Sequence, residues 1–504
     1  MKVVNLMCFV RQIDERLKNS TEQLFDFTKQ QVALVNEYPV DKTFLLQYDT
    51  VSDEQFVRLF KEETDERTEL GLWYEIVEPL TTACGLPYRS ENGWKWDWHI
   101  IPGFSMAYTP HERELLIDEA MRKFKEVFGF YPKTVASWLI DTHTVNYLTE
   151  HYDISAMAIC RDQANTDAYT LRGGYFNGGY YPSKSNMFTP AQTAEYQGKT
   201  PIFRLLGPCP IYNYDEKKYV SDEIKAIKHV CFTLEPGCFV GSTPKITDWF
   251  WHAYYDNESL GFSYAQIGQE NSFMIFGEQV LRGMRMQIEQ LLDRGDVTFQ
   301  KMKDTGDAFR GLYSETPATA VSAMDTWDTE DLQSVWYDCK HYSANLFRAG
   351  ERIFFRSFFL FDERVKDHYL EKTCETFDAV YENLPLIDTI FCEGEEGGAY
   401  GLSLDTEGDS FVTEREGENA LRIRFGEDSV LFREDRIEIR AKGLYLYRKA
   451  VPTALSVEAH TLSFRYKDAC YRVEIEKGTA TLLDNGDIKI SSADDQILLR
   501  PARA

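Results

Sequence analysis

Short apolar runs that end in charged or hydrogen-bonding side chains recur through the first half of the chain. Runs of this kind are typical of strands buried on both faces, as in a parallel sheet. The eight runs are Val3–Val10, Thr43–Gln47, Leu70–Tyr74, Val135–Ile140, Ile154–Cys160, Pro201–Leu206, Val230–Leu234 and Gly261–Ile267. The helical patterns between them include Ser20–Tyr38, Ser52–Glu63, Thr109–Phe128 and Phe276–Arg294. This alternation predicts an α/β fold with a (β/α)8-type, TIM-like barrel over residues 1–295.

The pattern changes beyond about residue 296. Val297–Ser314 and Ser343–Arg356 have helical patterns, which predicts a helical or mixed connecting region over residues 296–395. From residue 396 to 504, short alternating runs are separated by hairpin signals such as Asn485-Gly486. We therefore expect a C-terminal antiparallel β-sandwich domain, with a structural or a sugar-binding role.

Composition and charge narrow the classes of function. The 55 basic and 81 acidic residues give a formal charge of −26, which repels nucleic acid and anionic membranes. No apolar run approaches the roughly 18 residues of a membrane span, and the start of the chain does not read as a signal peptide. The ten cysteines are scattered without a CxxC pair. We expect a cytoplasmic protein that binds neither nucleic acid nor membrane and that forms a homodimer.

Carboxylates gather where the predicted strands end, which is the edge that carries the active site in barrel enzymes. Glycoside hydrolysis needs one group that protonates the leaving oxygen and another that activates water or attacks the anomeric carbon. The acidic candidates are Asp14, Asp49, Asp141, Asp162, Glu235 and Glu270. Each could instead cap the following helix or pair with a neighbouring arginine.

His143 is a candidate proton donor. It follows Asp141 by two residues, so both side chains would point inward if the strand continued to that point. A neighbouring carboxylate raises the pKa of an imidazole and keeps it protonated. A histidine with a purely structural role in the core is the alternative.

Arginines and aromatic residues supply the candidates for substrate binding. Arg11, Arg161 and Arg204 fall at or near the strand ends, and a guanidinium binds the carboxylate of an acidic sugar through a bidentate fork. Internal salt bridges, such as Arg11 with Asp14, are the alternative. The tryptophan-rich segment around Trp98 and His99 suits a platform for a sugar, and a loop packed on the barrel is the alternative. The long aromatic loop 163–198, which contains Tyr180, is predicted to form a lid or a pocket wall. The candidates added here are Trp98, His99 and Tyr180.

No cofactor or metal is expected. The chain has no GxSxG, HExxH, P-loop or GxGxxG pattern after a predicted strand, and its nine histidines include no HxxxH pair. This weakens the prediction of a metal-dependent carbohydrate deacetylase. A mononuclear metal site formed by Asp49, His99 and His143 is still geometrically possible.

The layout, with Asp14 after the first strand and His143 at a later strand end, resembles glycoside hydrolase family 156. That family consists of inverting exo-sialidases with a barrel and a β-rich C-terminal region. The resemblance implies that Asp14 activates water and that His143, with His99 as a rival, protonates the leaving oxygen. It also implies a sialylated oligosaccharide or glycoconjugate as substrate.

Three alternatives stay open. The first is a glycosidase for neutral sugars that uses two carboxylates, with Glu235 and Glu270 as the leading pair. The second is the metal-dependent carbohydrate deacetylase. The third is a sugar-binding protein without catalytic activity, in which the charged residues only stabilise the barrel.

Overall fold

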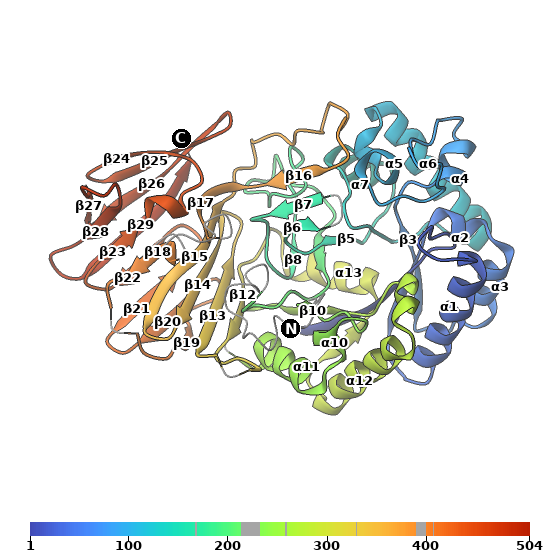
Figure 1. Ribbon diagram of the computed structural model, residues 1–504, viewed down its shortest axis with the longest axis horizontal. Coiled ribbons are helices and arrows are strands. Elements are labelled where there is room, and N and C mark those ends of the chain that lie inside the picture. Colours follow the sequence, from blue (N-terminus) through green and yellow to red (C-terminus); the bar gives the residue numbers. More distant parts are fainter. Residues whose placement is uncertain are drawn as a thin grey trace.

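The computed structural model describes residues 1–166, 169–212, 232–257, 260–328, 330–389, 400–406 and 408–503. Figure 1 shows a helix-rich N-terminal half beside a C-terminal half built almost entirely of strands. No helix in these described ranges is both long and apolar enough to cross a bilayer.

A curled, mainly parallel sheet forms the centre of the N-terminal half. Its parallel strands follow the order β10-β1-β2-β3-β4-β5-β9, with β11 paired to β1 and the short antiparallel β8 beyond β9. Their bounds are β1 (Lys2–Val10), β2 (Lys42–Leu46), β3 (Thr68–Trp73), β4 (Thr134–Ala136), β5 (Ala156–Cys160), β8 (Gly179–Tyr180), β9 (Ile202–Leu205), β10 (Ser263–Ile267) and β11 (Thr298–Gln300). Within the described residues β9 and β10 do not pair, so the described strands form a curled, barrel-like sheet whose closure is not shown.

Seven of the eight predicted runs are confirmed as strands of this sheet. The eighth, Val230–Leu234, lies partly outside the described residues; its Thr233 forms an isolated antiparallel bridge with Pro208. Strand β4 is shorter than predicted, because it ends at Ala136 and not at Ile140.

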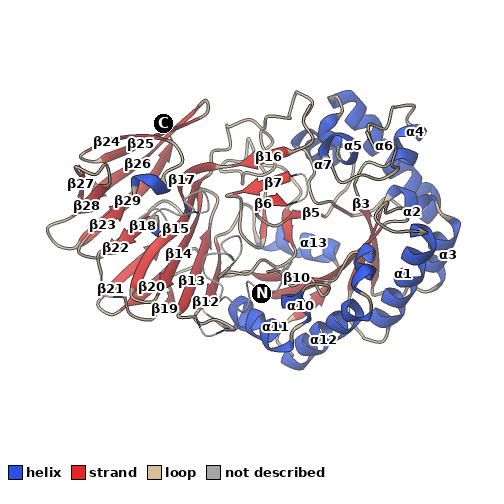
Figure 2. Cartoon of the chain, viewed as in Figure 1, coloured by secondary structure: helices blue, strands red, loops and turns tan. Residues whose placement is uncertain are grey.

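Helices cover the outer face of the sheet (Figure 2). The longer ones are α1 (Ser20–Asn36), α3 (Glu54–Glu62), α6 (Pro110–Phe128), α7 (Thr142–His151), α11 (Pro244–Trp251), α12 (Glu278–Arg294) and α13 (Met302–Leu312). The shorter ones are α2 (Tyr48–Ser52), α4 (Glu78–Ala83), α5 (Ile100–Gly103) and α10 (Phe239–Ser242). The sequence fixes the ends of α6 clearly: a capping box of Thr109 and Glu112 starts the helix, and Gly129, with φ of 86°, ends it.

Alternation along β1 determines which residues reach the barrel interior. Val3, Met7 and Phe9 pack in the interior cluster with Leu45 and Trp73. The intervening residues pack in a second cluster against α1 and α12, which is the period of two that a strand imposes. Arg11 is the next residue with inward parity after Phe9, so the strand itself aims Arg11 at the interior.

The predicted wall segment 163–198 has no helix in its described part. It contributes β6 (Gln163–Thr166) and β7 (Tyr169–Arg172) to a three-stranded sheet of order β16-β7-β6. The third strand, β16 (Ala379–Glu382), arrives from the C-terminal half and pairs in parallel with β7. The two halves of the chain are therefore joined next to the ends of the barrel strands.

Two antiparallel sheets form the C-terminal half and share one apolar core. The first has the order β12-β13-β14-β15-β18-β23-β28-β27, with β17 also paired to β15. Its strands are β12 (Thr319–Ala323), β13 (Leu332–Asp338), β14 (Tyr342–Ala349), β15 (Arg352–Leu360), β17 (Leu384–Asp388), β18 (Leu402–Leu404), β23 (Leu444–Leu446), β27 (Thr479–Leu482) and β28 (Ile488–Ser491). The second has the order β19-β20-β21-β22-β29-β26-β25-β24. Its strands are β19 (Val412–Arg415), β20 (Leu421–Phe425), β21 (Asp428–Phe432), β22 (Ile437–Arg440), β24 (Ala454–Glu458), β25 (Thr461–Tyr466), β26 (Ala469–Lys477) and β29 (Gln496–Arg503).

The prediction of a helical connector is wrong for Ser343–Arg356. This segment forms β14 and β15, joined by a turn in which Gly350 has φ of 57°. Nearly every residue of both strands is buried, so the sequence lacks the polar alternation that would have marked a strand. Val297–Ser314 is helical only in α13. The predicted domain boundaries near residues 295 and 395 stay predictions.

Asp338, at the end of β13, connects the first antiparallel sheet to the wall segment by accepting a hydrogen bond of 2.9 Å from the Phe176 amide. Burial raises the pKa of this carboxyl group to about 7. A carboxyl group with a raised pKa contributes stability that is complete in acid, below its ordinary pKa, and is lost as the pH rises through its folded-state pKa.

We therefore expect Asp338→Asn to raise the free energy of unfolding at pH 8 by roughly 2–4 kcal/mol. In acid the variant and the wild type should agree closely, because both then hold a neutral side chain. Urea unfolding at the two pH values measures the difference. An effect of the same size at both would contradict the burial of an ionisable Asp338.

Candidate active site

A cavity of about 260 Å³ lies at the C-terminal ends of the parallel strands. We call it the Arg11 cavity. Its lining consists of Arg11, Arg16, Glu75, Trp96, Trp98, Phe104, Trp138, Cys160, Arg161, Tyr169, Leu206, Glu235, Glu270 and Phe273. Arg11, Glu75 and Glu270 come from segments that directly follow β1, β3 and β10. This is the edge at which barrel enzymes place their chemistry.

Arg11 is the centre of the charged network in this cavity. Its Nη2 lies 2.9 Å from Oε2 of Glu270 and 3.6 Å from Oε2 of Glu75, and its Nη1 lies 3.6 Å from Oδ2 of Asp14. Asn271 fixes the backbone of Arg11, because its side chain accepts from the Arg11 amide at 3.1 Å and donates to the Arg11 carbonyl at 2.8 Å. The guanidinium is thus a fixed cation between buried carboxylates.

Glu75 and Glu235 complete a set of three buried carboxylates with Glu270. The indole of Trp96 donates a 2.9 Å hydrogen bond to Oε2 of Glu75. Burial raises the pKa of Glu75, and the charge of Arg11 and this hydrogen bond offset only part of that effect. Glu235 accepts from the side-chain amide of Gln269 at 3.1 Å.

The basic and acidic side chains of the lining balance in number. Three guanidiniums (Arg11, Arg16 and Arg161) face three carboxylates (Glu75, Glu235 and Glu270). Arg16 also binds Asp14 in a bidentate manner, at 2.9 and 2.6 Å. The cavity therefore carries no excess positive charge that would select an anionic sugar.

Aromatic rings provide the apolar wall. Trp98 and Trp138 both line the cavity and are half-buried, so part of each ring is open to a ligand. Trp138 is held edge-on by Phe9 and Trp73, with ring centroids 5.3 and 5.2 Å away, and Trp98 stacks on His99 at 5.2 Å. Rings held in this way are suited to the CH-rich face of a neutral sugar.

Asp14 and His143 do not meet in this cavity, and neither belongs to its lining. Asp14 is buried beside the cavity; burial alone would raise its pKa, but the hydrogen bonds from Arg16 and the charge of Arg11 hold it below its ordinary value. His143 lies in the first turn of α7, and its Nε2 is 3.0 Å from Oε1 of Glu114 on α6. His143 therefore faces the helical layer and not the strand ends.

Two predicted acids have structural roles at chain turns. Asp49 accepts hydrogen bonds from the amides of Gln12 and Ile13, at 3.0 and 2.8 Å, and burial raises its pKa to about 6. Asp141 is the N-cap of α7 and forms a 2.9 Å ion pair with the fully buried Arg113. Burial would raise the pKa of Asp141, but the charge of Arg113 and several hydrogen bonds lower it.

Arg204, Asp162 and Tyr180 lie outside the lining of the Arg11 cavity. Arg204 donates to the carbonyls of Cys160 and Tyr175 at 2.7 Å each and is 3.5 Å from Asp162. Asp162 accepts from the amides of Gly173 and Gly174, and the Tyr180 hydroxyl donates to the Met187 carbonyl. All three side chains stabilise the wall segment.

Beside Arg11, four other predicted residues line the Arg11 cavity: Arg161, Trp98, Glu235 and Glu270.

The residues proposed for a metal site are separated. His99 binds Asp97 through Nδ1 at 2.7 Å, while Asp49 and His143 have the partners described above. Among the described residues no group of three or more His, Cys, Asp or Glu side chains could hold a metal ion. The described part of the site therefore does not fit a mononuclear metal centre.

Glu75, Arg16 and Trp138 are among the lining residues that the sequence did not single out as site residues. Glu75 directly follows the apolar run Leu70–Tyr74, so the rule of strand-end acids covers it. Trp138 follows the true end of β4, which the overlong predicted strand concealed. Arg16 had no sequence signal beyond its distance of two residues from Asp14.

The structural roles of Asp141 and His143 predict different costs of replacement. Asp141→Asn should lower the free energy of unfolding by about 3 kcal/mol, because it leaves the buried Arg113 without its carboxylate. His143→Ala should lower it by less than about 1 kcal/mol, since its contact with Glu114 is partly exposed. Urea unfolding of both variants at pH 7 tests this; equal losses would show that the two environments are not as different as described.

No protein-family model matches the chain, and no curated protein matches it. Among solved structures, it is similar to a Parabacteroides distasonis protein to which the function glycoside hydrolase/deacetylase is ascribed. That match has 14% identity and a TM-score of 0.54, and it covers 77% of this chain and 91% of the other. A Mycobacterium smegmatis protein ascribed to the polysaccharide deacetylases matches at 11% identity with a TM-score of 0.35, covering 62% of this chain and 91% of that one. At 14% identity, the similarity to the Parabacteroides distasonis protein shows a shared fold and says nothing about activity.

The resemblance to the family 156 sialidases is wrong. The matched fold is that of a protein described as a glycoside hydrolase/deacetylase, and not that of a sialidase. The pattern behind the resemblance was a βα alternation with an acid after the first strand, which many barrels of unrelated activity share.

Proposed function

We propose that this chain is a carbohydrate-acting hydrolase, and within that class a glycoside hydrolase that cleaves a neutral sugar in the Arg11 cavity. The observation that carries the proposal is the presence of three buried carboxylates, Glu75, Glu235 and Glu270, around one cavity with aromatic walls. Hydrolysis of a glycosidic bond needs two such groups in different protonation states.

The environments of these carboxylates support different roles. Glu270 forms an ion pair of 2.9 Å with the guanidinium of Arg11, and it is the carboxylate that would accept the proton of an attacking water or attack the anomeric carbon itself. Burial raises the pKa of Glu75, which suits a group that donates a proton to the leaving oxygen. Glu235, the partner of Glu270 in the sequence-based pair, is the alternative proton donor.

The lining supports a neutral substrate. An acidic sugar would compete with Glu75 and Glu270 for Arg11, whereas a neutral ring can lie on Trp98 or Trp138 and leave that network intact. The name of the Parabacteroides distasonis protein includes deacetylase as well as glycoside hydrolase, which keeps a carbohydrate deacetylase as the second candidate.

A panel of aryl glycosides of neutral sugars and of acetylated sugars separates these reactions. We expect release of the aryl alcohol from at least one glycoside, with a rate that EDTA does not change. Release of acetate that stops on addition of EDTA would favour the deacetylase. Binding of sugars without either reaction would indicate the protein that only binds carbohydrate.

A further inference from the structure

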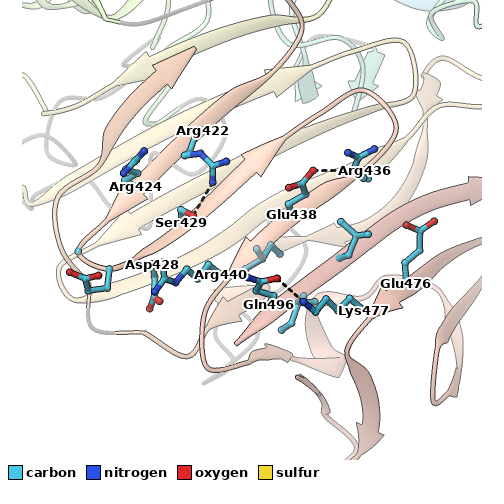
Figure 3. Close-up of a pocket in the computed structure, with 15 residues that line it drawn as sticks. Arg422, Arg424, Asp428, Ser429, Arg436, Glu438, Arg440, Glu476, Lys477 and Gln496 are labelled. Atoms are coloured by element: carbon cyan, nitrogen blue, oxygen red, sulfur yellow. Dashed lines mark hydrogen bonds and ion pairs between the residues drawn. The ribbon is translucent and has the colours of Figure 1, made fainter. Parts of the chain in front are cut away.

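The second antiparallel sheet carries a groove of about 810 Å³ (Figure 3). Ile423, Val430 and Ile439 belong to the core shared with the first sheet. Because side chains alternate along a strand, the residues next to them, such as Arg424, Ser429 and Arg440, point to the opposite, open face. These are among the side chains that line the groove.

One line of lining residues runs straight across four strands. Arg424 of β20 pairs with Ser429 of β21, Ser429 with Arg440 of β22, and Arg440 with Gln496 of β29. We call these four residues the polar row. Since neighbouring strands are about 4.8 Å apart, the row extends for about 14 Å.

The polar row offers hydrogen-bond donors and contains no carboxylate. In the part of the chain that the structure describes, the side chain of Arg440 forms no hydrogen bond or ion pair, and its neighbours Ser429 and Gln496 are neutral. Arg424 pairs with Glu414 at 2.9 Å, but both side chains are about half exposed, which makes the pair weak and exchangeable.

Two of the four carboxylates that line the groove, Glu438 and Glu476, are engaged by arginines; of the other two, Glu427 and Asp428, Asp428 accepts a hydrogen bond from the hydroxyl of Thr406. Glu438 accepts from Arg433 and Arg436 at 2.9 and 3.0 Å, and Glu476 from Arg500 at 3.2 Å. Although the chain has a formal charge of −26, the polar row is thus a place on its surface where a negatively charged group can bind.

We propose that the polar row binds an acidic polysaccharide. Arg424 and Arg440 would bind its carboxylate or sulfate groups, and Ser429 and Gln496 its hydroxyl groups. The groove is lined by no aromatic residue, so recognition depends on charge and hydrogen bonds rather than on ring stacking. The site is separate from the Arg11 cavity and does not depend on the reaction proposed there.

The test is the affinity of the full chain for polygalacturonate, dextran sulfate, neutral dextran and duplex DNA, measured by calorimetry at low salt. We expect binding to at least one of the two acidic polysaccharides and none to dextran or DNA. The polymer that binds distinguishes recognition of carboxylate from recognition of sulfate. The double variant Arg424→Met/Arg440→Met should raise Kd at least about tenfold.

Arg472→Met is the matched control, because Arg472 is an exposed arginine of the same sheet that does not line the groove. It should leave Kd within about twofold. Unchanged thermal unfolding of the double variant shows that its fold is intact, and its glycoside hydrolysis should equal that of the wild type. Absence of binding to both acidic polymers, equal binding to dextran, tighter binding to DNA, or a Kd that the double variant does not change would each overturn the proposal.

Discussion

Replacement of Arg11 by methionine is expected to lower the free energy of unfolding by about 5 kcal/mol at pH 7, because it removes the cation that three buried carboxylates share. Burial opposes the charge on Arg11, but Glu270, Glu75 and Asp14 together raise the pKa of the guanidinium above its ordinary value. Because methionine fills much of the volume of the arginine side chain, the loss of unfolding free energy would result from the missing positive charge and not from an empty cavity. The buried carboxyl groups of Glu75 and Glu270 would then lie together without the Arg11 cation that balances their charge.

Arg122→Met is the control for this measurement. Arg122 on α6 also pairs with two carboxylates, Glu119 and Glu126, but its side chain is 57% exposed. Its replacement should cost less than about 1 kcal/mol in urea unfolding. The deficit of Arg11→Met should shrink in acid, where protonation neutralises the carboxylates. If Arg11→Met unfolds like Arg122→Met, the network does not hold the strand ends together.

Glu270→Gln is expected to reduce kcat/KM for glycoside hydrolysis by about 10³-fold, since an amide can neither accept the proton of water nor attack the anomeric carbon. Glu75→Gln should cause a loss of similar size if Glu75 is the proton donor. In the wild type the rate should fall as the pH rises through the raised pKa of Glu75, because only the protonated form donates. Glu75→Gln should abolish this alkaline fall in its residual activity.

Glu69→Gln is the matched control for both variants. Glu69 is a buried glutamate of β3, the strand that Glu75 follows, but it lies near the other end of that strand and binds Thr43 and Thr134. Its replacement should leave kcat/KM within a few fold. Equal losses in Glu69→Gln and Glu270→Gln would point to general damage and not to chemistry in the Arg11 cavity.

The parallel sheet could be predicted because its strands are buried on both faces. A run such as Val3–Val10 has few arrangements other than a strand between a barrel interior and a helical layer. Burial on both faces is also the reason why the helical prediction for Ser343–Arg356 is wrong. Burial on both faces removes the alternation that separates a strand from a buried helix, and no turn signal stronger than Gly350 marks the hairpin.

The sequence allowed the location of the candidate site to be predicted, but not the full set of residues that line it. Strand-end polarity pointed to Arg11, Arg161, Glu235 and Glu270, and all four line the Arg11 cavity because parallel strands bring their C-terminal ends to one edge; their functional roles stay predictions. His143 lies outside the Arg11 cavity for a geometric reason. Strand β4 ends at Ala136, Asp141 caps α7, and the first turn of that helix carries His143 toward Glu114. Which strand-end residues point inward depends on where each strand ends, and propensity determines that boundary poorly.

The most direct test of the active-site assignment is a crystal structure of Glu270→Gln soaked with the glycoside that the wild type cleaves fastest. We predict a sugar ring against Trp98 or Trp138 in the Arg11 cavity, with the glycosidic oxygen within hydrogen-bond distance of Glu75 or Glu235. A glycoside bound elsewhere, with the Arg11 cavity empty, would contradict the assignment.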